Sequence, residues 1–297
     1  MAGGQERILK RRIKSVQATR KITKAMELIA ASQIAKSQAR ITANRPYRAG
    51  MRKIIIEAAE GDPAAAAKLL GTPEKVETAV VLAIVGDRGL SGAYNSSVLR
   101  ATERLVVELK SQGTQVRLFA VGKKSAAYFR FRGLDLERSF VGFADRPAFA
   151  DARVVAEVVA RAFITGEAQQ VLLVSTSFRS SASQAVASRQ LLPLVTEQSV
   201  ESSEPKPLKG YTEFEPEVAQ LLGELAPKAL ESEIFTALLE GAAAFHTSQQ
   251  RAMAAATENA DELRRTLTRV MNRARQDSIT TEIMEIVGGA EALRSGK

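Results

Sequence analysis

The chain has 297 residues, of which 45% are apolar and 25% charged, so it can bury a sizeable core in one large or two ordinary domains. It contains no cysteine and a single histidine, His246, which excludes disulfides, thiolate nucleophiles and metal sites built from cysteine or several histidines. No apolar run reaches the length of a membrane span and no apolar signal core opens the chain, so we expect a protein of the cytosolic side.

The net charge of +9 belongs to one segment. Residues 1–53 contain fourteen lysines and arginines but only two acidic residues, Glu6 and Glu27, so the rest of the chain is slightly acidic. A concentration of positive charge of this kind predicts an acidic partner surface, which could be nucleic acid, anionic lipid or protein.

The first segment, from about residue 5 to residue 59, has the pattern of a long helix. Apolar residues recur at helical spacing, at Leu9, Ile13, Val16 and then Ile22, Met26, Ile29, which predicts one buried stripe. Pro46 is expected to kink this helix or to interrupt its hydrogen bonds. The stretch at 61–63, Gly-Asp-Pro, is expected to end it.

The middle of the chain alternates short apolar runs with helical segments. Strands are predicted at 78–85, 116–121, 137–141, 171–176 and 190–195, and helices at 96–110, 123–132 and 149–163. This alternation indicates an α/β layer with a largely parallel sheet. Residues 197–209, rich in Ser, Glu and Pro, are expected to be the exit linker.

A second long helix is predicted from about residue 217 to residue 293. Its apolar stripe has a mean spacing of about 3.6 residues and comprises Leu238, Ala242, Phe245, Gln249, Met253, Ala256, Ala260, Leu263, Leu267, Val270 and Ala274. The stretch between Gly241 and Gly288 lacks Gly and Pro and corresponds to a rod of roughly 70 Å.

The predicted fold is therefore α/β: a long antiparallel coiled coil of the N- and C-terminal helices with an inserted Rossmann-like α/β domain. The expected domains are the N-terminal coiled-coil helix at 1–60, the α/β foot domain at 75–205 and the C-terminal coiled-coil helix at 210–297. The alternative is two separate helices that fold back onto the domain.

One glycine-rich loop, residues 86–93, follows a predicted strand and precedes a helix. It lacks the Lys-Ser/Thr pair of a phosphate loop and the glycine spacing of a dinucleotide fingerprint. A hydrolase built on Ser91 would need His246 as its base, and that histidine is expected to be partly exposed on the C-terminal helix, far from the sheet edge. We therefore expect a tight structural turn, and no catalytic residue, cofactor or metal site.

Three sets of residues resemble the gamma subunit family of F-type ATP synthases. They are the run from Arg12-Ile13-Lys14-Ser15-Val16 through Lys21-Ile22-Thr23-Lys24-Ala25-Met26-Glu27, the loop Asp87-Arg88-Gly89-Leu90-Ser91-Gly92-Ala93-Tyr94-Asn95, and the C-terminal segments at 254–260, 272–276, 279–283 and 285–290. They occur in the family's order over nearly the whole chain. The chain departs from the family pattern at Gln249-Gln250, where many members have Arg-Met.

The resemblance implies a central stalk that turns inside a hexamer of alpha and beta subunits and couples rotation of the c-ring to ATP synthesis or hydrolysis. Implied partners are alpha, beta, epsilon and the c-ring, with one copy per complex, and the implied location is peripheral on the cytoplasmic side of the bacterial inner membrane. Three sets of contact residues follow from the resemblance: a beta-subunit contact (Lys21, Lys24, Met26, Arg275, Gln276, Thr280, Glu285), an apolar bearing tip (Ile279, Ile283, Ile286, Val287, Leu293) and a c-ring or epsilon contact (Tyr211, Phe214, Glu215).

The basic N-terminal segment keeps one alternative open, a basic coiled-coil protein that binds nucleic acid. Against this alternative, the segment offers only Tyr47 for base stacking. Its apolar stripe is also predicted to be taken up by the partner helix.

Overall fold

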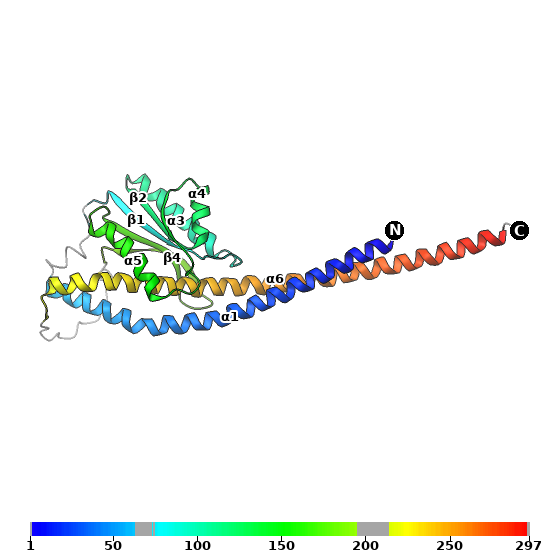
Figure 1. Ribbon diagram of the computed structural model, residues 1–297, viewed down its shortest axis with the longest axis horizontal. Coiled ribbons are helices and arrows are strands. Elements are labelled where there is room, and N and C mark those ends of the chain that lie inside the picture. Colours follow the sequence, from blue (N-terminus) through cyan, green and yellow to red (C-terminus); the bar gives the residue numbers. More distant parts are fainter. Residues whose placement is uncertain (1, 63–72, 74, 195–213, 296–297) are drawn as a thin grey trace. The chain divides into compact units, whose positions relative to one another are not determined.

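The computed structural model describes residues 2–62, 73, 75–194 and 214–295. Two helices dominate it, α1 (Ala2–Gly61) and α6 (Val218–Ser295) (Figure 1). The chain divides into two compact units, here called the terminal unit (residues 1–30 and 250–297) and the sheet unit (residues 31–249). Each long helix contributes to both units.

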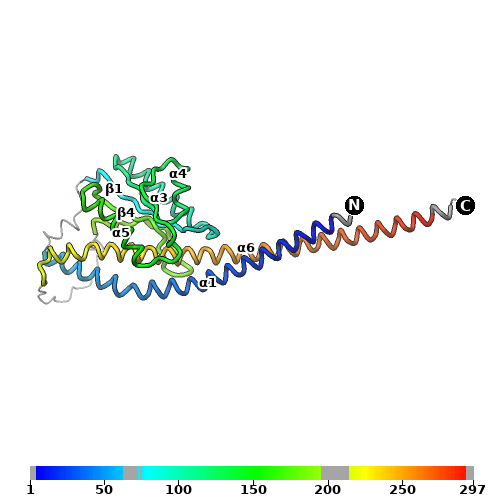
Figure 2. The backbone as a smooth tube through the Cα atoms, viewed as in Figure 1, coloured from blue at the N-terminus to red at the C-terminus, as the bar shows by residue number. Residues whose placement is uncertain are grey.

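In the terminal unit the two helices lie antiparallel (Figure 2). Arg20 Nε donates to Asp261 Oδ2 at 2.7 Å, and the hydroxyl groups of Thr23 and Thr257 lie 2.8 Å apart. Partner positions therefore run in opposite directions along the two helices. The antiparallel pairing predicted from the sequence is confirmed.

The stripe predicted for the N-terminal helix is partly wrong. The buried positions in this unit are Leu9, Thr23 and Ala30, whereas Ile22 and Ile29 are 60% and 59% exposed. Successive helical residues are about 100° apart, so a seam that contains Thr23 and Ala30 turns each preceding isoleucine outward. Leu263 and Val270 on α6 are also about half exposed, at 49% and 46%.

The break expected at Pro46 does not occur, because α1 continues through it. Pro46 lies on the exposed side of the helix, where water can bind the carbonyl that the missing N–H leaves without a helical partner. Pro227 is accommodated in α6 in the same way, on an exposed side.

The sheet unit contains five strands in the order β3-β2-β1-β4-β5. Their bounds are β1 Thr78–Ile84, β2 Gln115–Val121, β3 Leu136–Phe140, β4 Gln170–Phe178 and β5 Gln184–Leu192. The first four are parallel and β5 is antiparallel to β4. The last strand was predicted at 190–195 and begins six residues earlier, because its polar first half forms a hairpin with β4 at the sheet edge. Val195 and the predicted linker at 197–209 lie outside the described residues.

Helices cover both faces of this sheet. Alternate residues of β1 point to opposite faces: Val81 and Ala83 pack against α3 (Tyr94–Ser111) and α4 (Lys123–Phe131), and Leu82 packs against α5 (Phe149–Ile164). The largely parallel, doubly covered sheet confirms the Rossmann-like α/β prediction.

Within the sheet unit, α6 lies on the same face as α5. Leu230, Ile234 and Leu238 of α6 belong to the core under β1 and β4. The second half of α1 then packs on α6, where Arg48 donates to both carboxylate oxygens of Glu233 at 2.7 and 2.9 Å. Helix α6 is thus held between the sheet and α1.

Candidate functional site

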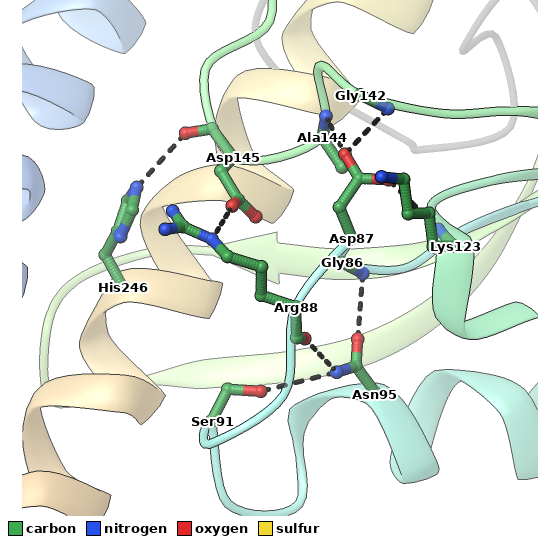
Figure 3. A network of polar contacts seen from close by, with 10 residues as sticks. All are labelled: Gly86, Asp87, Arg88, Ser91, Asn95, Lys123, Gly142, Ala144, Asp145 and His246. Carbon is green, nitrogen blue, oxygen red and sulfur yellow. Dashed lines mark hydrogen bonds and ion pairs between the residues drawn. The ribbon is translucent and has the colours of Figure 1, made fainter.

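The glycine-rich loop after β1 is organised around Asp87 (Figure 3). One carboxylate oxygen accepts the main-chain N–H of Lys123 at 3.0 Å, and the other accepts those of Gly142 and Ala144 at 3.0 and 3.1 Å. Lys123 begins α4, and the other two donors belong to the loop after β3. Asp87 therefore ties three strand-end loops together at the carboxyl edge of the sheet.

Asn95 closes the same loop from the first turn of α3. Its side-chain oxygen accepts the N–H of Gly86 at 2.8 Å, and its amide nitrogen donates to the carbonyl of Arg88 at 3.0 Å. Within this loop Leu90 has a left-handed backbone, with φ of 61°, and its side chain is 63% exposed. The tight structural turn predicted from the sequence is what the loop forms, but its organising residues, Asp87 and Asn95, were not foreseen. Their only sequence signal is that polar side chains follow a buried strand.

Helix α6 covers the carboxyl edge of β1. A Cβ placed on Gly86 would lie 3.0 Å from the ring of Phe245, and one placed on Gly241 would lie 3.1 Å from the hydroxyl of Tyr94. Phe245 and Tyr94 also meet edge to face, with ring centroids 5.7 Å apart. Glycine at both positions permits this close approach.

His246 is not where the sequence placed it. It is 2% exposed, and its Nε2 lies 3.1 Å from the carbonyl oxygen of Asp145 in the loop after β3. It was expected to be partly exposed and far from the sheet edge, but α6 runs along that edge and carries it inward. Burial lowers the pKa of His246, and the nearby Asp145 opposes that change. A neutral imidazole with its proton on Nε2 fits the carbonyl acceptor.

The site lacks the features of a hydrolase or a phosphate loop. Ser91 is 2% exposed and its hydroxyl accepts a hydrogen bond from Asn95, while Nε2 of His246 is engaged with a main-chain carbonyl. In doubly wound folds, ligands bind outside the carboxyl ends of the strands, at N–H donors such as those that start α4. Here the carboxylate of Asp87 takes those donors. In the described part of the chain no group of three or more His, Asp or Glu residues could hold a metal ion.

The residues of the predicted beta-subunit contact all lie in the terminal unit. Met26 is half-buried and the others are exposed: Lys21, Lys24, Arg275, Gln276, Thr280 and Glu285. Lys24 forms an ion pair with Glu27 at 2.9 Å. These side chains have little packing within the chain, so they remain available to another surface.

The predicted bearing tip is strongly apolar and exposed. Ile279, Ile283, Ile286 and Val287 are 49%, 53%, 71% and 54% exposed, and the neighbouring Met284 is 68% exposed. The side chain of Leu293 lies outside the described residues. Contiguous exposed apolar side chains usually mark a surface that another molecule covers.

The predicted c-ring or epsilon contact is described only in part. Tyr211 lies outside the described residues. Phe214 is half-buried, and its ring packs 3.1 Å from the Cβ position of Gly61 at the end of α1. Glu215 is exposed, so of the two described residues Glu215 is the more available to a partner.

A long antiparallel pair of terminal helices, with a doubly wound sheet inserted between them in sequence, defines the class of stalk-like coiled-coil proteins with an α/β insertion. A family model described as ATP synthase matches residues 5–293. Curated ATP synthase gamma chains from Parafrankia sp., Frankia casuarinae and Acidothermus cellulolyticus are 45%, 44% and 43% identical, over 98–99% of this chain and of theirs. The chain belongs to the ATP synthase gamma chain family.

Solved structures agree at the level of the fold. A chain of the mitochondrial ATP synthase from Euglena gracilis aligns with a TM-score of 0.68 and 17% identity, covering 99% of this chain and 96% of that one. A chain of the central stalk and c-ring assembly from Tetrahymena thermophila aligns with a TM-score of 0.61 and 23% identity, covering 79% of this chain and 99% of that one.

Proposed function

We propose that this chain is the central stalk (gamma) subunit of a proton-translocating F-type ATP synthase. It rotates inside the hexamer of alpha and beta subunits and couples c-ring rotation to ATP synthesis or hydrolysis. The observation that carries the proposal is the match to gamma chains at up to 45% identity over 99% of both sequences. The comparisons lend no support to the nucleic-acid-binding alternative.

The antiparallel helix pair gives the proposal a mechanical basis. Two helices packed along a shared seam and cross-linked by Arg20–Asp261 and Thr23–Thr257 resist bending and twisting better than one helix. The apolar tip, Ile279, Ile283, Ile286, Val287 and Leu293, is the proposed bearing. Apolar contact is not directional, so such a tip can turn against an apolar sleeve without breaking specific bonds at each step.

The proposed beta-subunit contact lies beside this tip. Lys21, Lys24 and Met26 would face acidic loops of the beta subunits. Arg275, Gln276, Thr280 and Glu285 would form hydrogen bonds or ion pairs with the surrounding sleeve. Their exposure in the terminal unit supports this assignment, because long charged side chains without internal packing can reorient toward a partner.

The chemistry is proposed to reside in the beta subunits, with this chain non-catalytic and without a bound cofactor. The buried Ser91 and the engaged His246 support this view. The foot, through Tyr211, Phe214 and Glu215, would contact epsilon and the c-ring. Among the described residues no helix is both long and apolar enough to cross a membrane. The proposed location is accordingly peripheral, on the cytoplasmic side of the bacterial inner membrane, with one copy per complex.

Mild purification from the native membrane tests this function. We expect the chain to co-purify in a fixed ratio with a magnesium-dependent ATPase and to leave the membrane together with it at low ionic strength. A chain that separates from the ATPase, or that elutes with nucleic acid in a salt-dependent manner, would contradict the proposal.

A further inference from the structure

A cavity of about 380 Å³ lies in the sheet unit where α1, β5 and α6 meet. This volume is within the range of small-molecule sites. Its charged wall carries three arginines, Arg48, Arg52 and Arg189, against one carboxylate, Glu233. The cavity is remote from the contacts proposed above, and its lining is positively charged.

Arg189 on β5 has donors that the chain does not satisfy. Its Nε and Nη2 have no accessible surface and no hydrogen-bond partner, and its Nη1 lies 3.9 Å from Glu233, beyond hydrogen-bond distance. Both oxygens of Glu233 already accept from Arg48. The Nε–Nη2 edge of a guanidinium is the fork that binds carboxylate or phosphate with two parallel hydrogen bonds. That edge is therefore formed and buried without its acceptor.

A second polar group lines the cavity in the same state. The side chain of Ser232, on α6, is 1% exposed, and its hydroxyl has no partner. Buried polar groups in native proteins are nearly always paired. Two lining residues from different elements, β5 and α6, thus both lack a partner, which points to a missing acceptor shared between them.

The remaining wall is apolar. Met51 and Ile55 of α1 and Leu191 of β5 line it, and Ile55 and Leu191 are otherwise buried, at 5% and 3% exposed. An inorganic ion would leave this wall in contact with water, whereas a short hydrocarbon body would cover it.

We propose that this cavity binds a small soluble anion with an oxyanion head, either a phosphate ester or a carboxylate, and a short apolar body. Nε and Nη2 of Arg189 donate to two oxygens of the head, and the hydroxyl of Ser232 donates to the same head. The body lies on Met51, Ile55 and Leu191. This site is independent of the proposed rotor function, since none of its residues belongs to the beta, bearing or c-ring contacts.

Isothermal titration of the full-length chain with three probes tests the proposal. We expect hexyl phosphate to bind, inorganic phosphate to bind more weakly, and hexanol not to bind. Arg189→Gln should lower the affinity for hexyl phosphate on the order of 10- to 100-fold, the effect of losing a charge-assisted pair of hydrogen bonds. Ser232→Ala should lower it by about 3- to 10-fold, the effect of one neutral hydrogen bond.

Arg179→Gln is the matched control, because Arg179 is exposed in the turn of the same β4–β5 hairpin. It should leave the affinity unchanged. The proposal is overturned if the native chain does not bind hexyl phosphate, if hexanol binds equally well, or if Arg189→Gln and Arg179→Gln behave alike. Equal affinity for inorganic phosphate would overturn the apolar part of the site.

Two further measurements complete the test. In the absence of ligand, Arg189→Gln should melt at the same temperature as the native chain or higher, because it removes a buried cation with unpartnered donors. A clear drop in melting temperature would mean that the chain itself supplies the acceptor, and would overturn the proposal. Sedimentation with vesicles of phosphatidic acid and phosphatidylcholine should show no dependence on Arg189, whereas a dependence would replace the soluble ligand with a lipid headgroup.

Discussion

The imidazole Nε2 of His246 on α6 lies 3.1 Å from the main-chain oxygen of Asp145 in the loop after β3. This contact joins the long C-terminal helix to the carboxyl edge of the sheet. It is also the one place in the described chain where a titration near neutral pH acts on tertiary packing, since His246 is the sole histidine.

The first prediction concerns this histidine. Burial lowers its pKa below the ordinary value of 6.5, so the unfolded chain takes up a proton before the folded chain does. The stability that neutral His246 contributes is therefore complete above pH 6.5 and is lost as the pH falls below it. We expect the free energy of unfolding, measured by urea denaturation, to fall between about pH 8 and about pH 5.5. His246→Gln should reduce that slope, and an unchanged slope would contradict the assignment.

The second prediction concerns Asp87. Because its carboxylate accepts three main-chain N–H groups, Asp87→Asn replaces one acceptor oxygen with an NH₂ group that faces a donor. We expect it to destabilise the chain by about 2 to 4 kcal/mol. Asp135→Asn, at an exposed carboxylate in the loop before β3, is the control and should stay within about 0.5 kcal/mol of the native value. Equal effects of the two substitutions on urea unfolding would show that the Asp87 contacts contribute no net stability.

The third prediction concerns Gly122 at the end of β2. Its φ is +100°, and a Cβ there would lie 2.3 Å from the carbonyl oxygen of Val85. Gly122→Ala should cost about 3 kcal/mol or more, since backbone strain and a steric clash act together. Gly133 has a φ of +67° with nothing within 4 Å of its Cβ position, so Gly133→Ala should cost about 1 kcal/mol. Thermal unfolding of the two variants separates the clash from the strain.

The fourth prediction tests the bearing tip. Ile286 and Ile164 are equally exposed, at 71% and 72%, so neither Ile286→Asp nor Ile164→Asp should change the melting temperature of the isolated chain appreciably. If the tip turns inside an apolar sleeve, Ile286→Asp should reduce assembly with the alpha and beta subunits on the order of 10-fold, because it buries an unpaired charge. Assembly is measured as ATPase recovered with the tagged chain, and parallel behaviour of the two variants would remove Ile286 from the bearing.

The fifth prediction tests the beta-subunit contact. Met26→Lys adds a positive charge beside Lys24 on the flank that is proposed to face acidic loops. We expect ATP hydrolysis to continue while ATP-driven proton pumping in membrane vesicles falls. Met26→Leu preserves size and apolarity and serves as the control, with coupling close to native. Normal coupling in the Met26→Lys variant would show that this residue does not contact the beta subunits.

Much of the fold could be predicted because it depends on local periodicity. The two long helices and four of the five strands lie within two residues of their predicted ends wherever those ends are described. The last strand was misplaced because its first half is polar and exposed at a sheet edge, where alternation is weak. Ile22 and Ile29 were assigned to the seam because helical spacing identifies a stripe but does not say which of two neighbouring stripes a partner covers.

The candidate site was less predictable. The loop at 86–93 could be identified as a turn, but the role of Asp87 depends on donors from Lys123, Gly142 and Ala144, which approach it only when β2 and β3 align beside β1. His246 and the cavity around Arg189 depend in the same way on where α6 lies against the sheet.

By itself, the sequence determined the two terminal helices, the α/β character of the insertion and the concentration of positive charge in residues 1–53, since each follows from composition or from the period of the backbone. The tertiary structure decided which face of each helix is buried, that α6 covers the carboxyl edge of the sheet, and that Arg189 is buried with two donors unpaired. These features arise between residues far apart in the chain, and their energies depend on burial and on partner distance, which no local pattern specifies.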